Sequence, residues 1–290
     1  YVLYLKDWKI MSYNKEIIDL RSRPAFLGEF YGSTPGTAGY EAAKWLNRRV
    51  GSKDDEHFTR SFTLAGFIDD IKESGITSAV VVGRDTPSLT VSNDVIYDVV
   101  KQHKELIGIA SVDPQTHGIK ATLDEIERST KQLYLKGINV EPGFGNPAVH
   151  ADDKDFLGVY DACQQLGLPL FIMSGPTTPN LEHTNPAAIG RIARDFPNLN
   201  IVVYHGSYPF VNEIIGVAFR YENVNVVPDM YLFQPKSKLF VEAANSFLNE
   251  QLLFATSYPF RPMKQTIDDF LELGFKDEIL DNLFHKNAKR

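Results

Sequence analysis

Two arginines that stand two residues apart, Arg21 and Arg23, are the first side chains whose types and spacing suggest chemistry. They end the run Glu16–Arg23, which alternates in the manner of a strand, so both point to the same side. A guanidinium is always charged, has no lone pair for a metal, and pairs through two hydrogen bonds with a carboxylate or a phosphate. The spacing therefore predicts a binding site for a small anion. Arg84 and Arg261 are candidates for the same site, and a structural role is an equally good alternative for both.

His205 and Ser257 are candidates for catalysis. His205 follows the apolar run that ends at Tyr204, and an unperturbed histidine, with a pKa of ~6.5, exchanges a proton near neutral pH. Ser257 follows another such run and would act as a nucleophile only with a base in reach, for which His205 is the candidate. The alternative for Ser257 is a small residue that fills space.

Acidic and aromatic residues stand close to the same strand ends. Glu141 and Asp229 are candidate general bases, and Glu141 is also a candidate substrate contact. The alternative is that Arg21 or Arg23 pairs internally with one of three acids, namely Asp113, Glu141 and Asp229. Aromatic residues could form an apolar wall for a ligand, although burial alone would also explain them: Phe144, Tyr204, Tyr231 and Tyr258.

Short β-branched runs alternate with amphipathic segments along the chain. Eight runs are predicted strands: 16–23, 78–83, 106–112, 137–141, 169–174, 200–206, 223–228 and 251–258. The predicted helices are 65–74, 93–104, 121–133, 155–166, 185–195, 210–220, 235–249 and 263–273, with a short one at 277–285. Eight strand-helix units in 290 residues predict a single-domain α/β protein, a (β/α)8 TIM barrel, whose functional side chains follow the carboxyl ends of strands.

Two segments depart from this rhythm. Residues 24–61 form a long insertion after the first predicted strand, either a lid over the active-site face or a packed surface insertion. Residues 1–10 precede Met11 and are interpreted as an extension or a tag remnant, so the barrel is expected over residues 11–290.

Composition excludes several classes of protein. A net charge of −7 argues against a nucleic-acid binder, and no apolar run approaches the ~20 residues that span a bilayer. The single cysteine, Cys163, leaves no internal disulfide and fits a cytoplasmic protein. No Gly-x-Gly-x-x-Gly turn follows the first strand, and no cofactor is predicted.

Four segments carry a resemblance to a known family: Gly137–Gly175 (beginning Gly-Ile-Asn-Val-Glu-Pro-Gly-Phe-Gly), Val203-Tyr-His-Gly-Ser, Leu252-Leu-Phe-Ala-Thr-Ser-Tyr-Pro-Phe260 and the closing Asn287-Ala-Lys-Arg290. In these motifs the chain resembles the amidohydrolase-related (amidohydrolase 2) family from about Glu16 to Arg290. That family includes decarboxylases that act on aromatic or muconate-type acids and lactonases that act on dicarboxylate lactones. The resemblance implies a barrel, a carboxylate-bearing substrate and, by analogy, a homodimer.

The chain departs from the family where the family binds its metal. The resemblance places Arg21 and Arg23 at two histidine ligands of the first strand, Met173 at the histidine of the fifth, and Ser257 at the aspartate of the eighth. The family's histidine after the sixth strand is kept, as His205, but one histidine does not make a zinc site. We therefore expect no metal here.

Three functions remain open from the sequence. The first is a metal-independent hydrolase, such as a lactonase, acting on a small carboxylate bound by arginines. The second is a decarboxylase-type lyase in which His205 handles the proton. The third is a non-catalytic relative that binds an anionic ligand. A charged arginine would be a costly filler for an idle pocket, which favours an enzyme.

Overall fold

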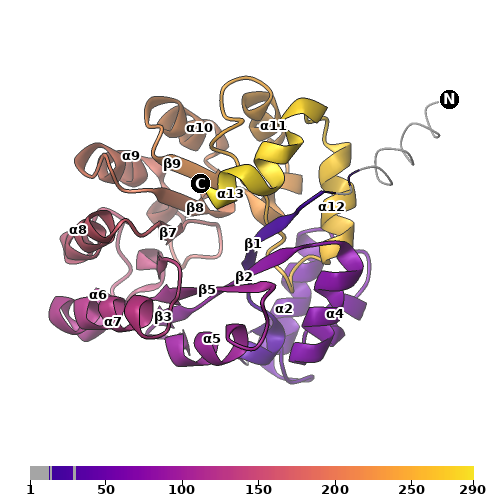
Figure 1. The fold of residues 1–290 in the computed structure, drawn as a ribbon, viewed down its shortest axis with the longest axis horizontal. Coiled ribbons are helices and arrows are strands. Elements are labelled where there is room, and N and C mark those ends of the chain that lie inside the picture. Colours follow the sequence, from indigo (N-terminus) through magenta and orange to yellow (C-terminus); the bar gives the residue numbers. More distant parts are fainter. Residues whose placement is uncertain (1–12, 14, 29–30) are drawn as a thin grey trace. The chain divides into compact units, whose positions relative to one another are not determined.

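The structure, a computed structural model, describes residues 13, 15–28 and 31–290 (Figure 1). The predicted extension over residues 1–10 lies outside the described residues. By its internal contacts the chain divides into two compact units. Unit 1 comprises residues 1–79 and 232–290, and unit 2 comprises residues 80–231.

Seven of the nine strands found in the described residues form one sheet. They are β1 (Ile18–Ser22), β2 (Ser78–Val82), β5 (Leu106–Ser111), β6 (Ile138–Val140), β7 (Leu170–Met173), β8 (Ile201–Tyr204) and β9 (Val224–Val227). The sheet order is β1-β2-β5-β6-β7-β8-β9, and each pair from β5 to β9 is parallel. The order follows the chain, as expected when each strand is followed by a helix that returns the chain to the same edge. These strands confirm seven of the eight predicted ones.

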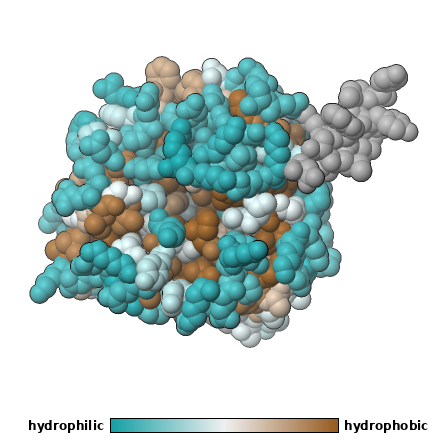
Figure 2. All heavy atoms as spheres, viewed as in Figure 1, coloured by the Kyte–Doolittle hydropathy of each residue, from teal (hydrophilic) through white to brown (hydrophobic). Residues whose placement is uncertain are grey.

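The helices of unit 2 alternate with these strands: α5 (Asn93–Val100), α6 (Pro114–His117), α7 (Ile119–Lys131), α8 (Leu157–Leu166), α9 (Pro186–Asp195) and α10 (Val211–Arg220). Figure 1 shows α8, α9 and α10 along the outer side of β7, β8 and β9. The strands are buried throughout because they are apolar on both faces, whereas each helix buries one stripe, such as Thr122, Ile126 and Ser129 of α7. Hydrophilic side chains cover much of the outer edge of the face drawn in Figure 2.

Unit 1 holds β1, both chain ends and the remaining helices: α2 (Ala38–Arg49), α3 (Glu56–Arg60), α4 (Leu64–Ser74), α11 (Lys238–Ala244), α12 (Met263–Glu272) and α13 (Asn287–Lys289). Gly75 ends α4 with a φ of 83°, and in unit 2 Gly167 ends α8 with a φ of 66°, as predicted for both. Within the described ranges, no helix combines the length and the apolar character needed to cross a membrane.

The predicted eighth strand, 251–258, is an irregular segment rather than a strand. It runs beside β1, where the Leu20 and Arg23 amides donate to the Phe254 and Tyr258 carbonyls, and it forms a single bridge to Ser22. A regular ladder fails because the Thr256 amide donates to the Asp19 carboxylate at 2.8 Å and because Ser257 has a φ of 58°.

Other differences from the prediction are local. The hairpin of β3 (Arg84–Thr86) and β4 (Leu89–Val91) was not expected from the sequence, because its strands are only three residues long. Two helices are shorter than predicted, α5 ending at Val100 and α11 covering only Lys238–Ala244. The predicted short helix at 277–285 is a 3₁₀ turn, Asp277–Ile279, followed by a π-helical turn, Asn282–Lys286.

The insertion after β1 is tied into unit 1 by buried polar contacts. Phe58 is fully buried, and the His57 ring nitrogen Nε2 lies 2.8 Å from Asn47 Oδ1 and 3.0 Å from the Pro259 carbonyl oxygen. Ser52 Oγ donates to the Phe260 carbonyl at 2.8 Å. These contacts support a packed insertion over a mobile lid for the part that contains α3.

The buried His57 ring predicts a loss of stability in acid. Burial lowers the pKa of His57 to about 4, whereas an unfolded histidine has a pKa of about 6.5. The unfolded chain therefore takes up the proton first, and the free energy of unfolding falls as the pH drops from 6.5 through 4, by up to about 3 kcal/mol. Urea unfolding from pH 7 to 4 should show a shallower fall for His57→Gln than for wild type. His103→Gln should keep the wild-type slope, and equal slopes in all three proteins would contradict the prediction.

Candidate functional site

His205 and Asp229 form a buried pair at the carboxyl ends of two neighbouring strands of unit 2. His205 follows β8 and Asp229 follows β9. His205 Nδ1 lies 2.9 Å from Asp229 Oδ1, and the His205 amide donates to Asp229 Oδ2 at 3.2 Å. Both side chains are almost completely buried. The carboxylate thus fixes the ring orientation and places a hydrogen on Nδ1.

The backbone around this pair is held in an uncommon conformation. His205 has a φ of 63° and Asp229 a φ of 44°, in the left-handed region that non-glycine residues rarely adopt. The His205 ring also lies against the chain after β7, because a Cβ on Gly175 would stand 2.7 Å from its Cδ2 atom. Such strain persists only where surrounding contacts impose it, and it is common at functional sites.

Aromatic rings line one side of the pair. Tyr231 packs edge-on against His205 at 5.1 Å between ring centroids, and Tyr208 stacks on Tyr231 at 5.3 Å. Tyr231 therefore lies against His205 with Tyr208 stacked on it, and its role in a ligand wall stays a prediction. Tyr204 instead stacks on Phe171 in the core, as expected of a side chain whose strand alternates away from His205.

Arg84 and Glu141 meet as a buried ion pair in unit 2. Arg84 Nε lies 3.1 Å from Glu141 Oε2, and the guanidinium stacks over the Phe144 ring at 4.6 Å. Arg84 also borders a pocket of about 370 Å³ whose other charged lining residues are Asp85, Asp94, Asp113, Glu125 and His117. So acidic a lining does not suit a carboxylate ligand, and these contacts favour a structural role for Arg84 and Glu141.

Breaking the Arg84–Glu141 pair is expected to destabilise the protein. Glu141→Gln keeps the shape and the contact with Asn139 but removes the negative charge that faces the buried Arg84 guanidinium, which costs about 3 kcal/mol. Adding Arg84→Met removes the charge and should recover most of the loss. Urea unfolding of the two single variants and the double variant measures this coupling, and simple additivity of the single effects would contradict it.

Arg21 and Ser257 come together in unit 1. Arg21 Nη1 donates to Ser257 Oγ at 3.2 Å, and Ser257 has the positive φ already noted. Arg23 is only 1% exposed, just beyond β1. The acids proposed as alternative partners of these arginines have contacts inside unit 2: Glu141 with Arg84, Asp229 with His205, and Asp113 with the Gln115 amide and Thr116.

Asp19 organises this part of unit 1. Its carboxylate accepts hydrogen bonds from the Thr256 amide at 2.8 Å, the Thr256 hydroxyl at 2.6 Å and the Ser22 hydroxyl at 2.9 Å. Burial raises the pKa of Asp19 to about 6, and the hydrogen bonds from Thr256 oppose that rise. Asp19 therefore links β1 to the segment that carries Ser257.

Two predicted ligand residues, Tyr258 and Arg261, are engaged inside unit 1. The Tyr258 hydroxyl lies 2.6 Å from Asp70 Oδ2 and 2.9 Å from the His57 carbonyl oxygen. Arg261 pairs with Asp269, donates to the Val50 carbonyl and stacks over Phe233. These contacts account for both polar groups without a ligand and favour structural roles.

Comparison with known proteins identifies the family. The amidohydrolase family model matches residues 49–290. The chain belongs to the amidohydrolase family. An uncharacterised TIM-barrel protein from Bordetella bronchiseptica is 31% identical, with 95% of this chain and 98% of that one covered and a TM-score of 0.86. A search of the curated proteins finds no match.

Two solved decarboxylases share the fold of this chain at lower identity. The 5-carboxyvanillate decarboxylase from Sphingomonas paucimobilis is 15% identical with a TM-score of 0.65, and 95% of this chain and 98% of that one are covered. The 2,6-dihydroxybenzoate decarboxylase from Rhizobium is 15% identical, with the same coverage and a TM-score of 0.66. The predicted TIM barrel and the predicted family are thereby confirmed.

The residues of this chain do not fit the metal site that its family implies. Arg21 and Ser257 stand at two of the expected ligand positions, and the contact between them is a guanidinium donating to a hydroxyl. A guanidinium has no lone pair to give a metal and repels a cation. In the described part of the chain, no group of three or more His, Cys, Asp or Glu residues could hold a metal ion.

Two residues of the site were incompletely assigned from the sequence. Asp229 was a candidate base or arginine partner, and the structure instead makes it the partner of His205. Asp19 received no role, although an acid inside an apolar strand is itself a signal of a buried network. Asp229 contacts a residue that follows a different strand, and Asp19 contacts Thr256 in a segment more than two hundred positions away, so sequence spacing could not reveal these two contacts.

Proposed function

We propose that this amidohydrolase-family protein is a lyase of the decarboxylase type, acting on a small aromatic carboxylic acid with His205 as the proton-transfer residue. The observation that carries the proposal is the buried His205–Asp229 pair, held in strained backbone at two strand ends. The main prediction from the sequence is the metal-independent hydrolase, with the decarboxylase and the non-catalytic relative as its alternatives, and the solved proteins that share the fold favour the decarboxylase.

The pair suits the chemistry of decarboxylation. The bond between the carboxylate and the ring carbon breaks, CO₂ leaves, and a proton must be delivered to that carbon. With Nδ1 bonded to Asp229, transfer to the substrate would use Nε2, and the carboxylate would stabilise the imidazolium that precedes it. No step is routed through a metal, because the residues present do not fit one.

The substrate class rests on the solved proteins that share the fold. One of them is a 2,6-dihydroxybenzoate decarboxylase complexed with 2,6-dihydroxybenzoate, and others carry carboxyvanillate in their names. Tyr208 and Tyr231 beside His205 would suit a flat aromatic ring. Arg21 and Arg23 stay predicted carboxylate-binding residues, tested separately by their effect on KM.

The hydrolase alternative has less support. The contact seen at Ser257 Oγ is a guanidinium donor, which cannot take the hydroxyl proton and so does not activate a nucleophile. The non-catalytic alternative would require the His205–Asp229 pair to serve only as a structural contact. Burying two ionisable side chains in strained backbone costs folding free energy, and a contact that is only structural does not require that cost.

The experiment is a screen for CO₂ release from hydroxybenzoates, carboxyvanillate and related aromatic acids, with lactones and enol esters as hydrolase substrates. Decarboxylation by wild type that is lost in His205→Gln and kept in His150→Gln would support the proposal. Lactone hydrolysis without CO₂ release would overturn it in favour of the hydrolase. Activity equal in wild type and His205→Gln would remove His205 from the mechanism, and activity abolished by a chelator and restored by Mn²⁺ would overturn the metal-free prediction.

A further inference from the structure

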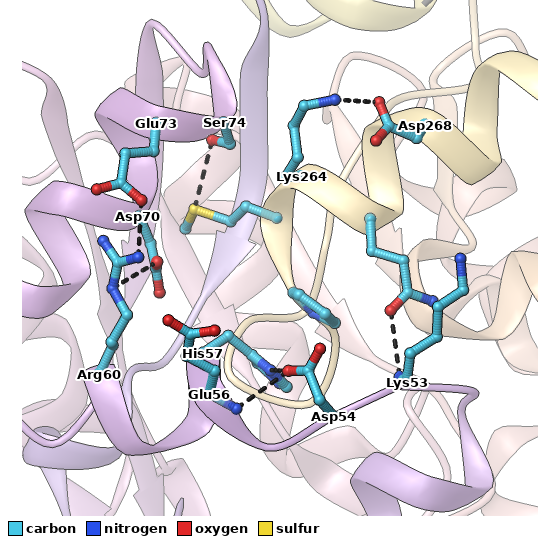
Figure 3. A pocket seen from close by; sticks show the side chains of 13 residues that line it. Lys53, Asp54, Glu56, His57, Arg60, Asp70, Glu73, Ser74, Lys264 and Asp268 are labelled. Atoms are coloured by element: carbon cyan, nitrogen blue, oxygen red, sulfur yellow. Dashed lines mark hydrogen bonds and ion pairs between the residues drawn. The ribbon is translucent and has the colours of Figure 1, made fainter.

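A second pocket, distinct from the His205 residues, lies within unit 1 and has a volume of about 430 Å³ (Figure 3). The segment before and along α3, helix α4 and the start of α12 surround it. Its charged and polar lining residues are Lys53, Asp54, Glu56, His57, Arg60, Asp70, Glu73, Ser74, Lys264, Gln265 and Asp268. We call it the His57 pocket.

The hydrogen on His57 can be placed from its neighbours. Nε2 lies 2.8 Å from Asn47 Oδ1 and 3.0 Å from the Pro259 carbonyl oxygen, so both neighbours are acceptors. The Asn47 amide is oriented independently, because its Nδ2 donates to the Ala43 carbonyl at 3.0 Å. Nε2 must therefore carry the hydrogen, which leaves Nδ1 with a lone pair.

The lone pair on His57 Nδ1 faces the pocket, and no hydrogen-bond donor from the described part of the chain reaches it. His57 is only 5% exposed, and among the described residues Nδ1 has no hydrogen-bond partner. The nearest polar atom given for it is Asp54 Oδ1 at 3.9 Å, and Figure 3 shows the Asp54 carboxylate turned toward the ring. Burial lowers the pKa of His57 to about 4, so the ring is neutral at pH 7. Two hydrogen-bond acceptors, His57 Nδ1 and Asp54 Oδ1, therefore face each other.

The charge of the lining is negative. Arg60 is shared between Asp70 and Glu73, and Lys264 pairs with Asp268. The remaining charged residues of the lining are Lys53, Asp54 and Glu56, so acids outnumber bases beside the His57 lone pair. Such a surface attracts a cation that can donate hydrogen bonds.

We propose that the His57 pocket binds a small organic amine, whose primary ammonium group lies between His57 Nδ1 and the Asp54 carboxylate and donates to both. An ammonium group suits this gap because it has three donors and one positive charge, whereas a carboxylate ligand would be repelled. The site is also connected to the segment after Ser257, since the opposite ring nitrogen of His57 donates to the Pro259 carbonyl.

Titration calorimetry with 1,4-diaminobutane at pH 7.5 and constant ionic strength tests this proposal. We expect saturable binding at one site. The affinity should fall at least about tenfold in Asp54→Asn, which removes a charged acceptor, and in His57→Gln, which removes a neutral one. Gln retains a donor that can reach Asn47 and Pro259. Glu127→Gln, an exposed acid on α7, is the matched control and should bind like wild type.

Uncharged 1,4-butanediol should not bind. The proposal is overturned if the diamine gives no saturable heat, if both pocket variants bind it as tightly as wild type, or if butanediol binds equally well. If His57→Gln fails to fold, Asp54→Asn decides alone, because the Asp54 side chain is 69% exposed and its loss should leave the fold intact.

Discussion

Replacing Asp229 with asparagine is expected to lower kcat for decarboxylation about 100- to 10,000-fold, the range over which a positioned acid or base acts. The substitution preserves shape, but an amide at this position can present a donor to Nδ1 and turn the ring to the wrong tautomer. It also removes the charge that stabilises the imidazolium, 2.9 Å away. Asp229 is a positioning residue, since it acts through His205.

Steady-state kinetics on the substrate found in the screen measure this effect. KM should change little compared with kcat, and the pH profile of kcat should move, because the carboxylate no longer favours the protonated ring. Asp153→Asn, a carboxylate of an outer turn in the same unit, is the matched control. A loss below about tenfold with an unmoved pH profile would mean that the pair is structural only.

Replacing Asp19 with alanine is expected to cost about 4 kcal/mol in the free energy of unfolding. The change leaves the Thr256 amide and hydroxyl and the Ser22 hydroxyl without their acceptor in a buried place, and each such loss costs about 1 to 3 kcal/mol. Relief from burying a carboxylate offsets part of the sum. Asp19→Asn keeps one acceptor and should lose less.

The pH dependence separates this network from a simple cavity. The pKa of Asp19 is about 6 in the folded protein and about 3.9 in the unfolded chain, so between these pH values the folded protein binds the proton more tightly. The contribution of Asp19 to stability is therefore greatest below a pH of about 3.9 and falls as the pH rises through 6. The difference between wild type and Asp19→Ala should therefore be larger at pH 4 than at pH 7. Urea unfolding at both pH values tests this, and a difference that is independent of pH would show that only packing was lost.

Most strands of the fold were predictable from the sequence, and one was not. Seven strands follow from short apolar runs, because a strand buried on both faces needs a continuous apolar sequence. The eighth run has the same composition, yet it does not form a strand. Its Thr256 amide bonds to a side chain from β1, and a contact with a residue more than two hundred positions away leaves no local signal.

For the site, the sequence by itself determined that four side chains stand at or just after strand ends: Arg21, Glu141, His205 and Asp229. It placed Ser257 at the end of a predicted strand that the structure shows to be an irregular segment. It also determined that the residues at the family's metal positions include arginines, whose chemistry suits an anion. The first result follows from residue type and from strand periodicity, which are both local, whereas the metal positions follow from the resemblance to the family.

Only the tertiary structure decided which of these side chains pair. In the structure His205 contacts Asp229, Glu141 forms an ion pair with Arg84, and Arg21 donates a hydrogen bond to Ser257. The physical reason is that a buried charge takes the partner that neighbouring strands and rotamers bring within about 3 Å, and that choice depends on packing between segments far apart in the chain. The sequence thus determined which residue types are present near the strand ends, and the tertiary structure determined which of them contact each other.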